Sequence, residues 1–267
     1  MKFIQLSKNQ RSDFQPGIVA IEKTVTYPFG DDFFKLDHGI DYFAFFDRLG
    51  EVYYYLALED DVLAATGAGI LRQIPYRQGE IPSPAWYLCD LKVHPDFLRR
   101  RLSLRMIRQG IYPNILRCTN GYGISMNPGD GKPNRFVRLL QRFPLVKFRC
   151  STILEIYTLD AATMYSIEPL LIEHRGPISY LSLQGIKDLT LESKAQTIPL
   201  LHLQWGSTSK KDIPSPMAGY KHMFCVPTDD ELAKALSKMG IYPCASASVV
   251  SHGMDNSDWK FILTSDI

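Results

Sequence analysis

Apolar and polar positions in the first 160 residues follow two spacings, alternation at every second residue and recurrence at every third or fourth residue. The first spacing is typical of strands and the second of helices. Tyr42, Phe45, Phe46 and Leu49 recur at helical offsets before Gly50, so their stripe is most simply a core-facing helix surface. The pattern predicts strands over 3–6, 52–58, 62–71, 86–93, 122–126 and 148–158, and helices over 12–23, 41–49 and 134–142, with a further helix that begins within 98–102.

A second set of elements is expected after residue 161. The helix over 228–239 has the clearest pattern, because Thr228 and Glu231 fit a capping box and Gly240 ends it. Its apolar face needs a partner to pack against. The neighbouring pattern predicts strands over 178–183, 198–204, 245–251 and 259–264, and a loop over 207–212.

Residues 87–104, YLCDLKVHPDFLRRRLSL, combine a buried strand, a stop at Pro95 and a basic turn that opens a helix. Free N–H groups at a helix N-terminus carry partial positive charge, and Arg99, Arg100 and Arg101 add cationic side chains. This order of elements predicts a site for the phosphate groups of a cofactor. The alternative is a basic helix start that faces solvent.

Composition narrows the class of protein. The 267 residues suit one to two domains, and a hydrophobic content of 45% is ample for a folded core. A formal net charge of +2 gives no global reason to expect nucleic acid or an anionic membrane surface as a partner. No apolar run approaches the ~20 residues that span a bilayer.

The cysteines give no sign of disulfides or of a metal site. Five cysteines are widely spaced, without a CxxC pair or a histidine at metal-ligand spacing, so we expect reduced and mostly buried thiols and no metal. The first residues also lack the features of a signal peptide, which indicates a cytoplasmic protein.

At the strand, turn and helix described above, the chain resembles the GCN5-related N-acetyltransferase superfamily. Its acetyl-coenzyme A motif is a strand that ends in a Val-x-Pro-like phrase, followed by QxxGxG or RxxGxG and a helix, and residues 93–97, VHPDF, match the approach to that loop. The loop itself departs from the family. Where the family prefers Gln or Arg, then Gly, then Gly or Ala, this chain has Leu98, Arg101 and Ser103.

The resemblance implies an α/β (α+β) fold with a mixed, mostly antiparallel central sheet flanked by helices over 1–160. Residues 161–267 would form a second, smaller α/β domain of unknown role, which a degenerate second half of the same kind would explain. The implied cofactor is acetyl-CoA, with its thioester carbonyl near main-chain amides of Leu91 and Val93. Its phosphates would lie at Arg99, Arg100 and Arg101 and at the helix start, Leu102 and Ser103.

Asn134 opens the next predicted helix, and in the family an asparagine at this place commonly faces the pantetheine arm. As a helix N-cap Asn134 needs no ligand, and this second interpretation is equally open.

The resemblance also supplies a candidate base. Asp90 lies three residues before Val93 in an otherwise apolar strand, at the place where polyamine acetyltransferases have an acidic residue facing the amine. An alkyl amine is mostly protonated at neutral pH, so a carboxylate should take its proton. The alternative places Asp90 on the solvent face of the strand. Cys89, its neighbour, would point the opposite way, into the core.

The family's usual tyrosine, which meets the departing thiolate, is replaced by Gln141. Tyr122 and Tyr157 are possible substitutes, with core packing as the simpler interpretation of each. His94 could act near the amine, although a lone histidine is more often a surface or hydrogen-bonded residue.

Three functions follow from these residues. The first is an acyl-CoA-dependent N-acyltransferase, with acetyl as the expected group, acting on a small-molecule or peptide amine by direct transfer in a ternary complex. The second, suggested by the missing loop glycines and by Gln141, is a CoA-binding or ligand-sensing module without catalysis. Nucleic-acid binding through the arginines is the weakest, because no reading motif accompanies them.

Overall fold

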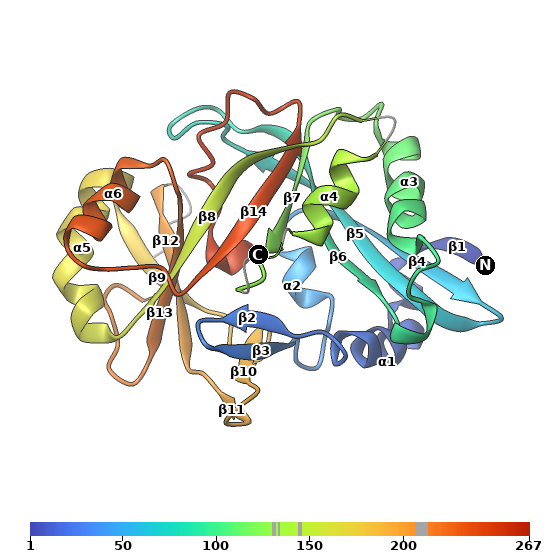
Figure 1. Ribbon diagram of the computed structural model, residues 1–267, viewed down its shortest axis with the longest axis horizontal. Helices are drawn as coiled ribbons and strands as arrows, with labels where there is room; N and C mark the ends of the chain where they lie inside the picture. Colours follow the sequence, from blue (N-terminus) through green and yellow to red (C-terminus); the bar gives the residue numbers. More distant parts are fainter. Residues whose placement is uncertain (130–131, 133, 144–145, 207–212) are drawn as a thin grey trace.

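The computed structural model describes residues 1–129, 132, 134–143, 146–206 and 213–267 (Figure 1). Within these residues, ten strands form one mixed sheet that runs the length of the molecule. Its pairings are antiparallel except for β6 with β7 and β12 with β13. In spatial order the strands are β1 (Lys2–Leu6), β4 (Glu51–Glu59), β5 (Val62–Ile74), β6 (Ser83–Val93), β7 (Gly121–Met126), β14 (Ala245–His252), β8 (Arg149–Leu159), β13 (Lys221–Pro227), β12 (Leu200–Trp205) and β9 (Ile178–Ser182).

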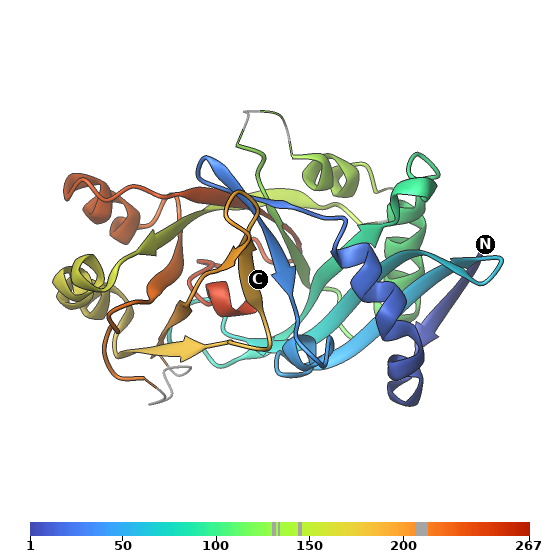
Figure 2. The ribbon, with the colours of Figure 1, turned by 90° about the horizontal axis from the view of Figure 1, so that it is seen from below.

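A smaller sheet pairs strands from before and after position 160. It has the order β11 (Gln196–Thr197), β10 (Asp188–Leu191), β3 (Asp32–Asp37) and β2 (Tyr27–Phe29). The pairing of β10 with β3, from Asp188 opposite Asp37 to Leu191 opposite Phe34, brings residues from the second set of elements against the first. Figure 2 shows this sheet crossing one face of the large sheet beside α1 (Arg11–Glu22).

Helices cover both faces of the large sheet. Alternate side chains of β4 point to opposite faces. Tyr54 and Leu56 pack in one cluster with Ile18 of α1, whereas Tyr55 packs in another with Met106. The remaining helices are α2 (Ala44–Asp47), α3 (Leu102–Asn114), α4 (Arg135–Gln141), α5 (Ala161–Arg175) and α6 (Glu231–Lys238), with short 3-10 turns η1 (Lys8–Gln10), η2 (Pro95–Phe97) and η4 (Thr264–Asp266).

Strand β14 places residues from the end of the chain in the middle of the sheet. It pairs with β7 from Ala247 opposite Met126 to His252 opposite Gly121, and on its other edge with β8. Its inward side chains Ala247 and Val249 are fully buried. Residues on both sides of position 160 therefore share one hydrogen-bonded sheet, and the boundary at 160 stays a prediction.

Most predicted elements are confirmed, but the N-cap expected for one helix and one expected strand are wrong. The helix expected over 228–239 has Asp230, not Thr228, as its N-cap: the Asp230 carboxylate accepts from the Leu232 N–H at 2.8 Å. Thr228 donates its hydroxyl to the Ile153 carbonyl instead. The strand expected over 259–264 is a series of turns that leads into η4, since these apolar side chains are buried without alternation.

The sequence pattern does not predict α5, β2, β3, β10, β11 or β13, and it overestimates α2. Helix α5 has a broadly distributed set of apolar residues rather than one stripe, so its spacing gave no signal. Strands β2 and β3 are short and carry aromatic residues on both faces. Helix α2 is one turn long, although Tyr42, Phe45 and Phe46 are buried as expected. The loop expected over 207–212 lies outside the described residues.

The cysteines are free, as expected, but they are less buried than predicted. Cys225 is buried, Cys89, Cys118 and Cys244 are half-buried, and Cys150 is exposed. None of the helices that the structure describes is long and apolar enough to cross a membrane.

Candidate active site

Strands β6 and β7 separate part-way along their length. Their parallel register runs from Trp86 opposite Gly121 to Leu88 opposite Gly123. Beyond it β6 continues to Val93 along β5, and β7 continues to Met126 along β14. The sheet therefore opens at its centre, between two strands that each keep their outer partner.

Main-chain N–H groups of β6 face this opening. The His94 N–H donates to the Ala64 carbonyl of the β5 side at 2.9 Å. Because hydrogen-bonding groups alternate in direction along a strand, the N–H groups of Val93 and Leu91 point to the other edge. The side chains of Leu91 and Val93 pack on the α3 face of the sheet with Met106.

A β-bulge sets the direction of Asp90. Thr66 lies opposite Lys92 and Ala68 lies opposite Cys89, so Gly67 alone faces the two intervening residues. Asp90 has φ +55, a left-handed conformation that aspartate tolerates better than most residues. The extra residue puts the side chains of Cys89, Asp90 and Lys92 on one face, so the expectation that Cys89 and Asp90 point in opposite directions is wrong.

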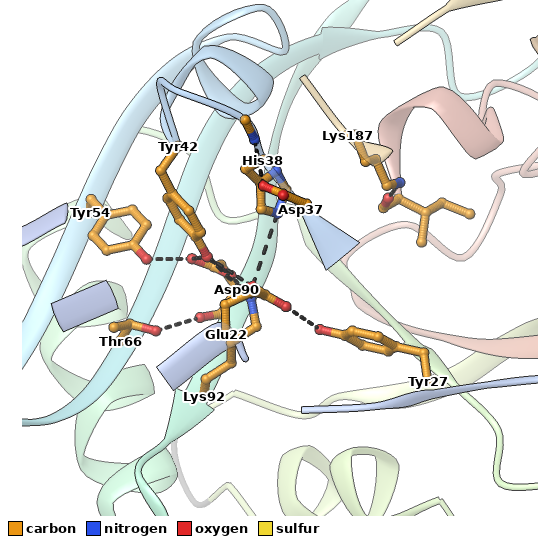
Figure 3. Close-up of polar contacts among 12 residues, drawn as sticks. Glu22, Tyr27, Asp37, His38, Tyr42, Tyr54, Thr66, Asp90, Lys92 and Lys187 are labelled. Atoms are coloured by element: carbon orange, nitrogen blue, oxygen red, sulfur yellow. Dashed lines mark hydrogen bonds and ion pairs between the residues drawn. The ribbon is translucent and has the colours of Figure 1, made fainter. Parts of the chain in front are cut away.

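The bulge turns the Asp90 carboxylate into a buried polar cluster (Figure 3). The Tyr42 hydroxyl donates to it at 2.9 Å from either carboxylate oxygen, the Tyr54 hydroxyl donates to Oδ2, and Lys92 Nζ pairs with Oδ1. The side chain of Asp90 is 1% exposed to solvent. The alternative of a solvent-facing Asp90 is therefore excluded.

Glu22, at the end of α1, is the second carboxylate of this cluster. Lys92 Nζ pairs with its Oε2, and the Tyr42 hydroxyl oxygen lies 3.0 Å from the same oxygen, so the single O–H hydrogen of Tyr42 can go to either Asp90 or Glu22. His38 Nε2 lies 4.0 Å from that oxygen. One ammonium group is thus shared by two carboxylates, an arrangement that holds all three side chains in place.

Burial and charge set the proton affinities of the cluster. Burial raises the pKa of Glu22, and the Lys92 charge opposes it. Burial alone would lower the pKa of Lys92, yet the charges of Asp90, Tyr27 and Glu22 raise it above its ordinary value. Burial also lowers the pKa of His38 to about 4. At neutral pH the cluster therefore contains an ammonium and a neutral imidazole.

A cavity of about 1110 Å³ connects the two faces of the sheet through the opening. On the α3 face its lining includes Leu91, Met106 and Asn134. On the opposite face it includes Asp90 and Lys187. Glu22, Tyr42 and Tyr54 do not line the cavity and support Asp90 and Lys92 from behind.

The basic turn before α3 has the backbone shape of a glycine loop without its glycines. Arg99 has φ +69 and Arg101 has φ +57, both in the left-handed region. Arg101 is the N-cap of α3 and its side chain makes no capping hydrogen bond in the described structure, so the N-cap side chain leaves the first N–H groups of the helix, at Leu102 and Ser103, unsatisfied.

The three arginines of this turn differ in their partners. Arg100 pairs with Glu59 and stacks on Phe97, 5.0 Å from its ring centroid. Arg99 and Arg101 form no ion pair with the described residues. These two side chains, rather than Arg100, are available to an anion.

Asn134 has a full set of hydrogen bonds. Its Oδ1 accepts from the N–H groups of Phe136 and Val137, as an N-cap does, and its Nδ2 donates to the carbonyls of Ser125 and Met126. The side chain ties the start of α4 to the free part of β7 at the opening. Its N-cap role is confirmed, and a role toward a cofactor stays a prediction.

Of the other candidates, Tyr122, Tyr157 and His94 do not line the cavity, whereas Cys89 does. Tyr122 is fully buried and accepts from Arg72 at 2.9 Å, and Tyr157 donates to Glu155, so both serve the core. His94 accepts from the Asp96 N–H at the start of η2. Cys89 lines the cavity, and burial raises the pKa of its thiol.

Sequence reasoning missed most of the polar cluster. Lys92 lies in the same predicted strand as Asp90. Two charged residues at alternate positions of an otherwise apolar strand are a signal of a buried polar cluster. Tyr42 was assigned to the core stripe, and Glu22 was not considered. The residues described contain no group of three or more side chains that could hold a metal ion.

Comparison with known proteins bears on the fold. No family model matches the sequence. An uncharacterised protein of Acanthamoeba polyphaga mimivirus is 24% identical over 273 residues, which cover 99% of this chain and 80% of that protein. A tandem GNAT protein from the clavulanic acid biosynthesis pathway superposes with a TM-score of 0.51 at 9% identity, covering 94% of this chain and 97% of that one.

The chain has the fold of the GCN5-related N-acetyltransferases. A crystal structure of a putative acetyltransferase from Pyrococcus horikoshii aligns over 96% of this chain and 92% of that one, with a TM-score of 0.48 and 10% identity. The predicted resemblance and fold class, a mostly antiparallel sheet with helices on its faces and a smaller second region, are confirmed.

Proposed function

We propose that this protein is an acyl-CoA-dependent N-acyltransferase that transfers an acyl group, with acetyl as the expected one, directly to an amine. The observation that carries the proposal is the opening between β6 and β7, where a single cavity lined by Met106 and Ile107 of α3 on one face reaches the buried carboxylate of Asp90 on the other. Cofactor and acceptor can meet in such a passage from opposite faces of the sheet.

The residues around the opening fit coenzyme A. The N–H groups of Leu91 and Val93 have no strand opposite them, as a hydrogen-bonded pantetheine arm requires. The N–H groups at Leu102 and Ser103, which the N-cap side chain does not cap, together with Arg99 and Arg101 would provide donors for phosphates. When bound, acyl-CoA supplies an activated thioester.

The main chain contributes to catalysis by holding donors where negative charge develops. An N–H group of Leu91 or Val93 that points at the thioester oxygen would stabilise that charge, and one such donor is worth ~3 kcal/mol in comparable sites. The bulge at Asp90 fixes the direction of these groups, because it sets the register of the strand beyond it.

Asp90 is the cavity-facing group that would receive the amine proton. Its carboxylate and that of Glu22 share one ammonium, Lys92, so the three groups carry one surplus negative charge while both carboxylates are ionised. A proton taken from the acceptor neutralises this surplus without leaving a buried charge unpaired. Tyr42 and Tyr54 hold Asp90 in position for that transfer.

Binding and catalysis are tested by separate measurements. CoA and acetyl-CoA should each raise the melting temperature and give measurable heat of binding, since a ligand that binds the folded state stabilises it. Acyl transfer should release free thiol when acetyl-CoA is mixed with an accepted amine. Saturating CoA that produces neither a thermal shift nor heat would overturn the proposal.

A second candidate is a CoA-binding or ligand-sensing module without catalysis. It is favoured by Gln141 at the family's tyrosine position and by arginine and serine in place of the loop glycines. CoA binding without thiol release across a broad panel of amines would select it.

A further inference from the structure

The cavity wall on the Asp90 face of the sheet is built largely from apolar and aromatic side chains. The buried core residues that line it include Phe34, Phe45, Ile156, Leu189 and Met223. They come from β3, α2, β8, β10 and β13, so both halves of the chain contribute to it. The wall is also long, because β13 lies four strands from β6, a distance of about 19 Å at ~4.8 Å per strand.

The hairpin formed by β2 and β3 presents an aromatic face to the cavity. Tyr27 is directly opposite Phe34, and their rings stack with centroids 5.3 Å apart. Phe29 lies two residues after Tyr27, on the same face, and meets Phe34 edge-on at 6.0 Å. All three residues line the cavity. The hairpin is held at its turn, where the Gly30 N–H donates to the Cys244 carbonyl at 3.0 Å, and along β3 by its pairing with β10.

This aromatic face begins beside the carboxylate that would receive the amine proton. The Tyr27 hydroxyl lies 3.5 Å from Glu22 Oε1, and Glu22 shares the Lys92 ammonium with Asp90 (Figure 3). An amine nitrogen held at Asp90 is therefore close to the first aromatic ring of the hairpin.

The inner part of the lining offers no free side-chain carboxylate among the residues that the structure describes. Three described residues of the lining carry side-chain carboxylates, which are Asp31, Asp32 and Asp90. The first two are at the hairpin turn. Farther in, Lys187 Nζ donates to the main-chain oxygen of Ile267, so that oxygen is occupied. His38 and His202 are neutral, because burial lowers the pKa of both rings. A second ammonium on the acceptor would meet a lysine and neutral rings there.

We propose that the acceptor is a primary amine with an extended apolar body, which places its nitrogen at Asp90 and its body between the β2–β3 hairpin and the wall that includes Met223. The inference rests on the proposed acyl transfer for the identity of this ligand as the acceptor. Two carboxylates that share one lysine leave a surplus negative charge for a single ammonium. The remaining affinity comes from the apolar surface that the body removes from water.

Two amines with the same four-carbon chain test this acceptor class without any enzymatic reaction. The probes are 4-phenylbutylamine and 1,4-diaminobutane, titrated calorimetrically into the full chain at pH 7.5, with and without saturating CoA. We expect the phenyl compound to bind at least ten-fold more tightly than the diamine. Phe29→Ala should reduce this preference at least three-fold. Tyr165→Ala is the control, because it removes an aromatic side chain that is 69% exposed on α5 and does not line the cavity.

The length of the space is tested at the far wall. Met223→Ala shortens a side chain that lies opposite His202 in the β12–β13 register, and both residues line the cavity. We expect the affinity for 6-phenylhexylamine, relative to 4-phenylbutylamine, to rise at least three-fold in this variant. An unchanged ratio in a folded variant would overturn the placement of the body against Met223.

Equal affinities for the first two probes, a preference for the diamine, or no binding of either amine overturns the acceptor class, and this comparison on the unaltered protein needs no variant to fold. A preference that stays the same in folded Phe29→Ala overturns the position of the body at the hairpin. The proposed function fails separately, if CoA neither binds nor supports thiol release. If both stand, kcat/KM should also be higher for 4-phenylbutylamine than for the diamine.

Discussion

The large sheet contains two parallel strand pairs, and they differ in what joins them. Both have the same short register, from Trp86 opposite Gly121 to Leu88 opposite Gly123 in β6–β7 and from Leu200 opposite Lys221 to His202 opposite Met223 in β12–β13. The first pair is connected through a basic turn and the 13-residue helix α3. In the connection of the second pair, the described residues 206 and 213–220 contain no α-helix.

Because of this difference, the β6–β7 pair and the β12–β13 pair contribute different groups to the cavity. The first pair opens beside a helix N-terminus and exposes main-chain donors to the cavity. The second pair keeps its strands buried and contributes His202 and Met223 to the far wall. Under the proposed function, the same strand arrangement would serve a cofactor site only where a helix start and its N–H groups are added, and at the second pair it would shape the acceptor side.

The largest expected effect comes from separating the two pairs at residue 160. A chain of residues 1–160 lacks β14, which pairs with both β7 and β8. It therefore exposes the core residues that Val249 packs against in the full chain. We expect this fragment not to fold, as measured by near-ultraviolet circular dichroism and cooperative unfolding. A soluble fragment that unfolds cooperatively and binds CoA would show that the first pair is independent of the second.

The next effect concerns the face that receives the acceptor. Asp90→Asn should lower the acyl-transfer rate by ~100-fold, the lower range for loss of a general base, and leave CoA affinity nearly unchanged. Glu22→Gln is the matched control, because it removes the other carboxylate that pairs with Lys92 but does not line the cavity. Equal rate losses in the two variants would mean that both act through the stability of the cluster.

How far the sequence predicted these features depends on the distance between the residues involved. The strand, turn and helix over 87–104 were predictable because local spacing determines them. The partners of Asp90 were not, since Tyr42 lies 48 residues away and Glu22 lies 70 residues from Lys92. The strand expected over 259–264 failed for a related reason: Trp259 and Ile262 are buried by neighbours that spacing does not reveal.

A smaller effect should appear in how the free energy of unfolding changes with pH, because His38 is buried in its neutral form. His38 has a pKa of about 4 when folded and about 6.5 when unfolded, so the unfolded chain binds its proton first. Stability is therefore lost as the pH falls from 6.5 toward 4. Between pH 8 and pH 5 this loss is about 2 kcal/mol, and His38→Asn should remove it. Urea unfolding at both pH values measures the difference; identical pH dependence in the two proteins would contradict the buried neutral state.

The smallest expected effect tests whether main-chain groups or arginines carry phosphate binding at the first pair. Arg101→Gly removes one charge but relieves a left-handed residue at φ +57, where glycine has no steric cost. Loss of a charged hydrogen bond costs roughly 1.5 kcal/mol or more, so we expect about ten-fold weaker CoA binding together with a small gain in melting temperature of the free protein. Arg101→Asn is the control, because asparagine tolerates the same φ as glycine but also removes the charge. If CoA binds both variants as tightly as the unaltered protein, the N–H groups of α3 carry the interaction without the Arg101 side chain, and the arginine is there only for the turn.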